Sequence, residues 1–494
     1  METTKTLEYD VTVVGGGNAG LCAAIEAANL GIRVLLLEKA PRERRGGNSR
    51  FTGGRWRFAY DNSRKEVVPL LELSSLPVPL ENIDFQPYPK DAFYADMMRV
   101  SQGLAEKHWS EVIVNKSLAA MYWLKEQGVK FELDNIVTKG DRILVGQENI
   151  IRNVNLGEGL VEMLYSTAEA KKIPILYETA ARSLIVDADG GVCGVIAKSK
   201  EGLIKINSKS VILACGGLEA SVEMRRRYLG EGWDLAKNRG TRYNTGDGLR
   251  MALEIGAQSH GHWGGCHASV VSEDSPQVEA ETVGCIRYSY LYCIMVNING
   301  ERFLDEGEDM VAFTYAKIGR QIAAQPTGVA FQIFDAKVTP YLLPEYQGAT
   351  RVEADSIESL ADQAGIDVEG LVNTVNQFNQ AVCDDKPFMY GIRDGRRTKG
   401  IKPEKTNWAQ KIDTPPFLAY AVVRGLTFAY GGLKINDKTQ VMDTSEQPIE
   451  GLYAVGELPG GLFYHNYASG SGLMKGTITG RTAAAEAAAR IAKR

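Results

Sequence analysis

Residues 9–38 read YDVTVVGGGNAGLCAAIEAANLGIRVLLLE, and this stretch decides the fold. The apolar and β-branched residues at Tyr9–Val14 predict a buried strand, and a similar pattern returns at Val34–Leu37. Between them LCAAIEAANLG predicts a helix that closes on Gly31. The order strand, helix, strand is typical of the first unit of a Rossmann-like parallel sheet.

Three glycines at the first strand–helix junction, Gly15, Gly17 and Gly20, have G-x-G-x-x-G spacing. In such a motif the first glycine makes a tight turn, the second lets the backbone approach a pyrophosphate, and the third lets helix and strand pack closely. The N–H groups of the helix N-terminus then face the phosphates. Glu38 follows Gly20 by 18 residues, about where a ribose-binding acid is expected. The pattern therefore predicts a dinucleotide site.

A second glycine-rich stretch, RRGGNSRFTGG at Arg44–Gly54, favours FAD over NAD as that dinucleotide. An NAD domain has no need of such a segment. A flavin enzyme does, because the flavin ring lies against backbone beyond the second strand.

The composition bounds the class of protein. The chain has 494 residues, of which 44% are hydrophobic and 24% charged, so a disordered, collagen-like or coiled-coil chain is excluded. The net charge of -5 gives no basic excess, and we expect no nucleic-acid partner. No run approaches the ~18 apolar residues of a membrane span, and no apolar leader is seen, so we expect no integral membrane segment and a cytoplasmic location.

We expect no metal site. The seven cysteines are scattered and form no CxxC pair, so neither a zinc or iron–sulfur site nor a disulfide framework is predicted. His260 and His262 form an HxH pair, but the sequence offers no third ligand near them.

Two domains are expected because the length exceeds what one hydrophobic core usually holds. The predicted fold class is α/β, a Rossmann-like FAD-binding domain with an inserted α+β capping domain. The FAD-binding domain is assigned to residues 1–261 and 427–494, and the capping domain to residues 262–426. Residues 61–90 mix proline and charge without clear periodicity and are interpreted as a surface excursion or flap.

Together these pieces resemble the flavoprotein family of fumarate reductase and succinate dehydrogenase over nearly the whole chain. The matching motifs are GGGNAG with Glu38, GGNS, ILACGG, NTGDGLRMALEIGA, NINGERFLDE and GLYAVGE. Within the family the sequence is most similar to tricarballylate dehydrogenases, through GGCHAS, GLTFAYGGLKI and GLFYHNYASGSGLMKG. This resemblance implies an FAD enzyme that oxidises a carbon–carbon single bond next to a carboxylate, with the hydride passing to the flavin.

The resemblance also implies where FAD binds. Glu457 would hydrogen-bond to ribityl or ribose hydroxyls, and the N–H groups of Leu473 and Met474 would face the flavin N1–C2=O edge, where the reduced ring carries negative charge. The expected cofactor-binding residues are Gly15, Gly17, Asn18, Ala19, Gly20, Glu38, Lys39, Gly46, Gly47, Asn48, Ser49, Thr52, Gly53, Gly54, Ala180, Ala214, Cys215, Gly216, Gly217, Asn244, Gly246, Asp247, Gly456, Glu457, Ser471, Gly472, Leu473 and Met474.

The sequence departs from the family at positions that matter for chemistry. Arg42–Arg45 stands where relatives carry the histidine that attaches the flavin covalently, so we expect non-covalent FAD. Met310 and Val311 stand near the place of the arginine proton donor, Tyr467 replaces a carboxylate-clamping arginine, and Phe428 replaces a histidine. Fumarate or succinate itself is therefore not expected as the substrate.

Tyr467 has a second interpretation, and the alternatives stay open. In 3-ketosteroid Δ1-dehydrogenases a tyrosine at a similar place polarises a ketone together with a backbone N–H, which Ser471 would supply here. An enoate reductase running in the reverse direction and a flavin-binding protein with a degenerate site are further possibilities. The substrate is thus a small-molecule acid or ketone. The electron acceptor is unknown, because no haem motif is fused to the chain.

Other catalytic candidates follow from position and residue type. His267 lies in GGCHAS, where relatives place a substrate-binding histidine, and His465 adjoins Tyr467. Arg287 and Arg424 are candidate bidentate ligands for substrate carboxylates.

Proton transfer is assigned to Tyr315 or Arg320, in TYAKIGR, since the usual arginine is missing. Alternation along a predicted strand would place Tyr288, Tyr290 and Tyr292 on one face and Arg287 on the other.

Overall fold

A computed structural model describes residues 5–134, 136–139, 142–145, 150–280 and 282–493 of the chain. The chain divides into two units. The first contains Met1–Trp233, Gly240–Cys266 and Phe428–Arg494, and the second contains Asp234–Arg239 and His267–Thr427. The second unit thus includes a short segment, Asp234–Arg239, that the sequence did not assign to the inserted domain.

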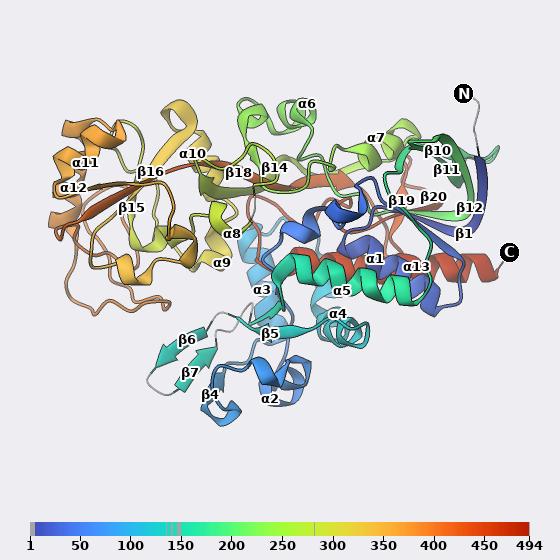
Figure 1. Ribbon diagram of the computed structural model, residues 1–494, viewed down its shortest axis with the longest axis horizontal. Coiled ribbons are helices and arrows are strands. Elements are labelled where there is room, and N and C mark those ends of the chain that lie inside the picture. The colour runs from blue at the N-terminus through green and yellow to red at the C-terminus, as the bar shows by residue number, and fades with distance from the viewer. Residues whose placement is uncertain (1–4, 135, 140–141, 146–149, 281, 494) are drawn as a thin grey trace. The chain divides into compact units, whose positions relative to one another are not determined.

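An eight-stranded mixed sheet forms the centre of the first unit (Figure 1). The buried strand expected near Tyr9 is β1, which pairs in parallel with β2 on one side and with β12 on the other. Strand β12 also pairs in parallel with β20, while β10, β11 and β19 add antiparallel pairs. The strands are β1 (Lys5–Val14), β2 (Val34–Leu37), β9 (Ile175–Leu176), β10 (Ala180–Val186), β11 (Val192–Ser199), β12 (Gly202–Leu213), β19 (Gln440–Met442) and β20 (Pro448–Ala454).

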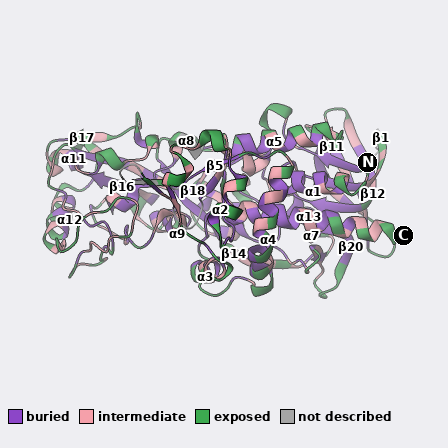
Figure 2. Ribbon diagram, turned by 90° about the horizontal axis from the view of Figure 1, so that it is seen from below, coloured by how far each residue is buried: buried purple, intermediate pink, exposed green. Residues whose placement is uncertain are grey.

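Helices pack beside this sheet. The helix expected after the glycine motif is α1, which lies against the C-terminal helix α13 and against α5 (Figure 1). Helix α1 is buried along most of its length (Figure 2), and β2 is buried along all of its length. The helices are α1 (Asn18–Asn29), α3 (Lys90–Val100), α4 (Lys107–Glu126), α5 (Leu156–Ala170), α7 (Asp247–Glu254) and α13 (Ser471–Ala492).

Residues 61–90, interpreted from sequence as irregular, hold the one-turn helix α2 (Ser63–Glu66), three 3₁₀ turns and the short strand β4 (Ile83–Phe85). Val67 and Leu70 from this segment are fully buried. Apolar side chains therefore partly anchor the segment in the first unit, and the sequence showed no periodic pattern that predicted their burial.

The second unit is built on a mixed sheet with two apolar clusters. Helices α11 and α12 pack against each other. The chain passes between the two units within β14 and β18. The elements are β13 (Lys237–Asn238), β14 (Ser259–Ser272), β15 (Ile294–Val296), β16 (Val329–Phe334), β17 (Val352–Ala354), β18 (Phe417–Leu433), α10 (Ile318–Ala323), α11 (Ile357–Ala364) and α12 (Val368–Ala381).

The strand predicted over the three tyrosines is wrong. Residues Ser289–Tyr292 form a 3₁₀ turn instead. The turn buries Tyr288, Tyr290 and Leu291 in one apolar cluster, whereas a strand would send Leu291 to the face opposite the tyrosines. Burial of one more large side chain therefore outweighs the alternating pattern.

No helix among the residues the structure describes is both long and apolar enough to cross a membrane.

Gly20 is a position where this fold has no room for a side chain. A Cβ atom built on Gly20 would lie 1.9 Å from the carbonyl oxygen of Gly15. We expect Gly20→Ala to lower the free energy of unfolding by about 1–3 kcal/mol, because a backbone atom cannot move away as a side-chain end could. Urea unfolding measures the change. Gly264→Ala is the matched control, since the nearest atom to its Cβ is 4.0 Å away, and equal losses in the two variants would contradict the prediction.

Candidate functional site

The junction of β1 and α1 presents bare backbone. Gly15 has φ +108° and its N–H donates to the carbonyl of Leu37 at 2.8 Å. Gly17 caps α1 without a side-chain hydrogen bond, and the first turn contains no acidic residue. Near Gly17 the first atoms a Cβ would meet are 3.4 Å away. A helix N-terminus of this kind favours an anion close to its N–H groups.

Glu38 lies at this junction, as its spacing predicted. Its Oε2 accepts a hydrogen bond from the N–H of Gly16 at 3.1 Å, and its Oε1 accepts one from Ala40 at 2.8 Å. Burial raises the pKa of the Glu38 carboxyl, and these backbone N–H groups oppose the rise. The Tyr165 hydroxyl donates to the same Oε2 at 3.4 Å.

The second glycine-rich stretch reaches the same place from the other side. Ser49 Oγ accepts from the N–H of Asn18, in the first turn of α1, at 2.9 Å. Asn48 Oδ1 accepts from the N–H of Thr241 at 2.9 Å. The two segments that sequence analysis assigned to one dinucleotide are therefore in direct contact.

Two carboxyl groups stand beside Gly217. The N–H of Ala429 donates to Oε1 of both Glu219 and Glu457, at 2.9 and 3.0 Å. Burial, followed by the charge of Glu219, raises the pKa of Glu457 well above its usual range. Glu457 was expected here, whereas Glu219 was missed because nothing in the sequence separates it from a surface acid.

The start of α13 is held together by Tyr467. Its phenol oxygen accepts from the N–H groups of Gly470 and Gly472 at 3.0 and 3.1 Å. The N–H of Ser471 donates to the carbonyl of Ala468 at 3.2 Å. Burial raises the pKa of the Tyr467 phenol, against the effect of these N–H donors.

A buried arginine supports this loop and was not selected from the sequence. Arg57 is fully buried, and its Nε donates to the carbonyl of Ser469 at 2.8 Å. Its Nη1 donates to the Tyr88 hydroxyl at 2.6 Å and pairs with Asp96 at 3.3 Å. Arg57 thereby ties the strand after the second glycine stretch to the loop before α13.

All the residues expected to bind the cofactor lie in the first unit. Lys39 pairs with Asp247 at 2.7 Å, which joins the end of β2 to the start of α7. The side chain of Asn18 donates to the carbonyl of Leu473 at 3.0 Å, which joins α1 to the first turn of α13. Ala180 opens β10, and Ala214 follows β12 directly.

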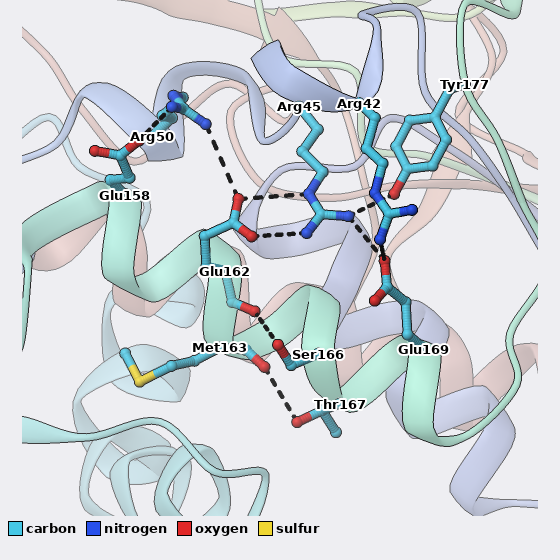
Figure 3. A network of polar contacts seen from close by, with 10 residues as sticks. All are labelled: Arg42, Arg45, Arg50, Glu158, Glu162, Met163, Ser166, Thr167, Glu169 and Tyr177. Atoms are coloured by element: carbon cyan, nitrogen blue, oxygen red, sulfur yellow. Dashed lines mark hydrogen bonds and ion pairs between the residues drawn. The ribbon is translucent and has the colours of Figure 1, made fainter.

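The Arg42–Arg45 segment, which stands in place of a flavin-attaching histidine, points to helix α5 (Figure 3). Arg45 is 5% exposed and donates to Glu162, Glu169 and the Tyr177 hydroxyl at 2.7, 2.9 and 2.8 Å. Its guanidinium carbon also lies 4.1 Å from the ring centre of Tyr165. Because Tyr165 contacts Glu38, Arg45 supports the junction of β1 and α1 through Tyr165.

In the second unit the structure brings His267 and Tyr315 together, with their ring centres 4.7 Å apart. His267 Nδ1 lies 3.1 Å from Ser269 Oγ. Burial, then the charge of Arg239, lowers the pKa of His267 well below its usual range, so the ring is neutral at physiological pH. Tyr288 is the third ring of the group, 5.2 Å from Tyr315.

Arg239 belongs to the same group and was missed by sequence analysis. It is 5% exposed, and its Nη1 donates to Ser269 Oγ at 2.9 Å and to Thr427 Oγ1 at 3.0 Å. No signal in KNRGTRYN marks it, because its partners lie 30 and 188 residues away in the sequence.

The other arginine candidates have different surroundings. Arg287 is buried and its Nη1 donates to the carbonyls of Gly284, Ile286 and Glu345. Arg424 is 8% exposed and lies against Gly328, and burial lowers its pKa while the charge of Asp234 opposes this. Arg320 is exposed on α10.

His465 lies on the surface of the first unit. Its N–H donates to His262 Nδ1 at 3.2 Å, and the two rings are 4.8 Å apart. Its backbone has φ +58°. The side chain is exposed, so His465 is placed for loop geometry as well as for contact with a ligand.

Comparison with known proteins agrees with this architecture. Residues 80–473 match the FAD binding domain family, and residues 10–128 match the FAD dependent oxidoreductase family. A probable fumarate reductase of Shewanella frigidimarina is 27% identical over 99% of this chain and 75% of its own length. The structure of the open conformation of a flavocytochrome c3 fumarate reductase has a TM-score of 0.74 and 25% identity, covering 99% of this chain and 79% of that one.

A 3-ketosteroid Δ1-dehydrogenase of Sterolibacterium denitrificans has the same fold, with a TM-score of 0.74 at 22% identity over 98% of this chain and 99% of that one. The chain belongs to the FAD binding domain family. It is an FAD-dependent oxidoreductase that acts on CH–CH bonds.

The residues present fit FAD. The start of α1, where Gly17 supplies no side-chain cap and the first turn has no acidic residue, suits a pyrophosphate. At the start of α13 the Tyr467 oxygen takes the N–H groups of Gly470 and Gly472, but the first turn contains no acidic residue, which suits the anionic edge of a reduced flavin.

Within the Arg42–Arg45 segment, Arg45 should be the residue that stabilises the junction of β1 and α1. We expect Arg45→Met to lower the free energy of unfolding by about 1–3 kcal/mol, because the charge-assisted hydrogen bonds of a buried guanidinium are lost. FAD affinity, measured by quenching of flavin fluorescence, should fall as well, since Tyr165 loses its support. Arg42→Met is the control, because the Arg42 side chain is 60% exposed. Equal effects of the two substitutions would contradict this role.

Proposed function

We propose that the protein dehydrogenates a carbon–carbon single bond next to a carboxylate, on a tricarballylate-type polycarboxylate, and passes the hydride to FAD. The observation that carries this choice of an acid over a ketone lies at the start of α13. A ketone dehydrogenase of the 3-ketosteroid type would need the Tyr467 hydroxyl and the Ser471 N–H together. That N–H donates to the carbonyl of Ala468 instead.

The chemistry would be divided among residues of the chain and the cofactor. FAD, when bound through the residues described above, supplies the hydride acceptor. In the second unit the neutral His267 can donate or accept a hydrogen bond without adding charge. Tyr315, ionised to the phenolate after its own proton has passed to solvent, is the preferred acceptor of the substrate α-proton, because it contacts His267 while Arg320 is exposed.

We propose further that FAD is held without a covalent bond. None of the five histidines lies in the Arg42–Ser49 segment, and Arg45 is turned toward α5 (Figure 3). Precipitation of the holoprotein with trichloroacetic acid should leave the yellow flavin in the supernatant. Flavin that remains in the washed pellet would show a covalent bond and refute this point.

The reverse direction, reduction of an enoate, is the second candidate. It is favoured by the name of the Shewanella relative, which is that of a reductase. Flavin potential and electron partner decide the direction, and the two can be separated by experiment. The oxidised holoprotein would be titrated anaerobically with tricarballylate, and the photoreduced holoprotein with fumarate and with aconitate.

Bleaching of the oxidised flavin by tricarballylate is the expected result. Reoxidation of the reduced flavin by an enoate without any bleaching by tricarballylate would favour the reductase. A flavin that responds only to a cyclic ketone such as a 3-ketosteroid would overturn the acid assignment.

Tyr467→Phe separates the acid and ketone hypotheses a second time. The variant keeps the ring between Phe428 and Phe463 but removes the acceptor of two N–H groups. We expect a lower melting temperature and a decrease of less than about tenfold in kcat with the acid, because the phenol then has only a structural role. A loss of a hundredfold or more in kcat at unchanged FAD content would place the hydroxyl in the chemistry.

A further inference from the structure

The charge balance around Arg239 is incomplete. Its guanidinium is buried, yet within the described ranges no carboxylate pairs with it. Two neutral hydroxyls, those of Ser269 and Thr427, are its hydrogen-bond acceptors, and its Nε has none. A buried charge is costly unless it is paired, and neutral dipoles offset only part of that cost.

Its neighbours add polar capacity but no negative charge. Ser269 Oγ lies 3.1 Å from both Thr427 Oγ1 and His267 Nδ1, so the hydroxyls and the imidazole form one connected group. The hydroxyl of Tyr288, whose ring centre is 5.9 Å from the Arg239 guanidinium carbon, is buried and has no hydrogen-bond partner among the residues that the structure describes. Two unsatisfied polar atoms thus belong to one small cluster in the second unit.

Arg287 is a buried arginine of the same unit whose Nε also has no partner among the described residues, but its acceptors differ from those of Arg239. Three backbone carbonyls accept from its Nη1, and its guanidinium carbon lies 5.3 Å from the ring centre of Tyr346. Those carbonyls belong to the turns on either side of it, so Arg287 closes the fold there. Arg239 closes no such turn with its side chain, and its acceptors are hydroxyls that can rotate toward a ligand.

We propose that Arg239, with the hydroxyls of Ser269, Thr427 and Tyr288, forms an anion site that binds one carboxylate of the substrate. The inference rests on the proposed acid substrate and names the group that recognises it. A carboxylate would take the free Nε–H together with a guanidinium N–H in a bidentate pair, and it would accept from the Tyr288 hydroxyl. It would also supply the negative charge that the cluster lacks.

Malonate tests the site without turnover, because it has a single methylene and therefore no CH–CH bond to oxidise. Its affinity for oxidised holoprotein would be measured by isothermal titration calorimetry. We expect Arg239→Gln to weaken malonate binding by at least about tenfold, since a charge-assisted bidentate contact is lost. Arg239→Lys should lose less, because it keeps the charge without the bidentate geometry.

Arg351→Gln is the control for a lost arginine charge in the same unit, since Arg351 pairs with Glu353 at the surface. It should bind malonate as the wild type does. Flavin content and melting temperature show whether each variant is folded. If Arg239→Gln does not fold, Arg239→Lys still tests the proposal. Wild-type malonate affinity in a folded Arg239→Gln or Arg239→Lys variant would overturn the proposal.

Failure of this site and failure of the proposed function give different results. If tricarballylate bleaches the flavin with the same concentration dependence in wild type and Arg239→Gln, the anion site is refuted and the acid dehydrogenase stands. If malonate binds through Arg239 while no acid bleaches the flavin, the site stands and the proposed reaction is refuted.

Discussion

The first unit depends on one close approach, that of helix α1 to the sheet at the glycine junction. Gly20 lies against the backbone of Gly15, and Gly15 lies against Ala214 at the end of β12. The last helix repeats the device, because a Cβ on Gly480 would lie 2.4 Å from the carbonyl oxygen of Ala19. Three segments far apart in the sequence therefore meet backbone to backbone, and the N-termini of α1 and α13 can both be directed at one ligand.

That close approach leaves no side chains at the place where a cofactor needs free N–H groups. The glycine junction must therefore be stabilised by side chains on the side away from the cofactor. Arg45 supplies this support through α5 and Tyr165, and Arg57 supplies it through the loop before α13. Both arginines are buried and paired with acids. Their charges are therefore satisfied within the protein, and they position the site without competing for an anionic ligand.

Sequence analysis was most successful where the information is local. The strand, the three glycines, the helix and Glu38 follow one another within thirty residues, and each has a conformational reason that can be stated for a single chain segment. The strand expected over Tyr288–Tyr292 was wrong because these residues form a 3₁₀ turn, in which Leu291 is buried together with the tyrosines. Propensity could not reveal this, since the burial comes from residues distant in sequence.

Arg239 could not be found from sequence for a related reason. What distinguishes Arg239 is that no carboxylate pairs with it among the described residues. The absence of a partner produces no recognisable motif in the sequence. The sequence offered Arg287 and Arg424 because each stands beside an aromatic or glycine-rich stretch, yet three backbone carbonyls accept from Nη1 of Arg287. The hydrogen-bond partners of a buried arginine indicate its role. An arginine paired with acids supports the surrounding structure, and one bonded to backbone carbonyls of a turn holds that turn. An arginine bonded only to hydroxyls keeps a positive charge that can bind an anionic ligand. If Arg239 binds the substrate as proposed, the segment Asp234–Arg239 contributes to recognition in the second unit, although it lies outside the inserted stretch that sequence analysis assigned to the capping domain.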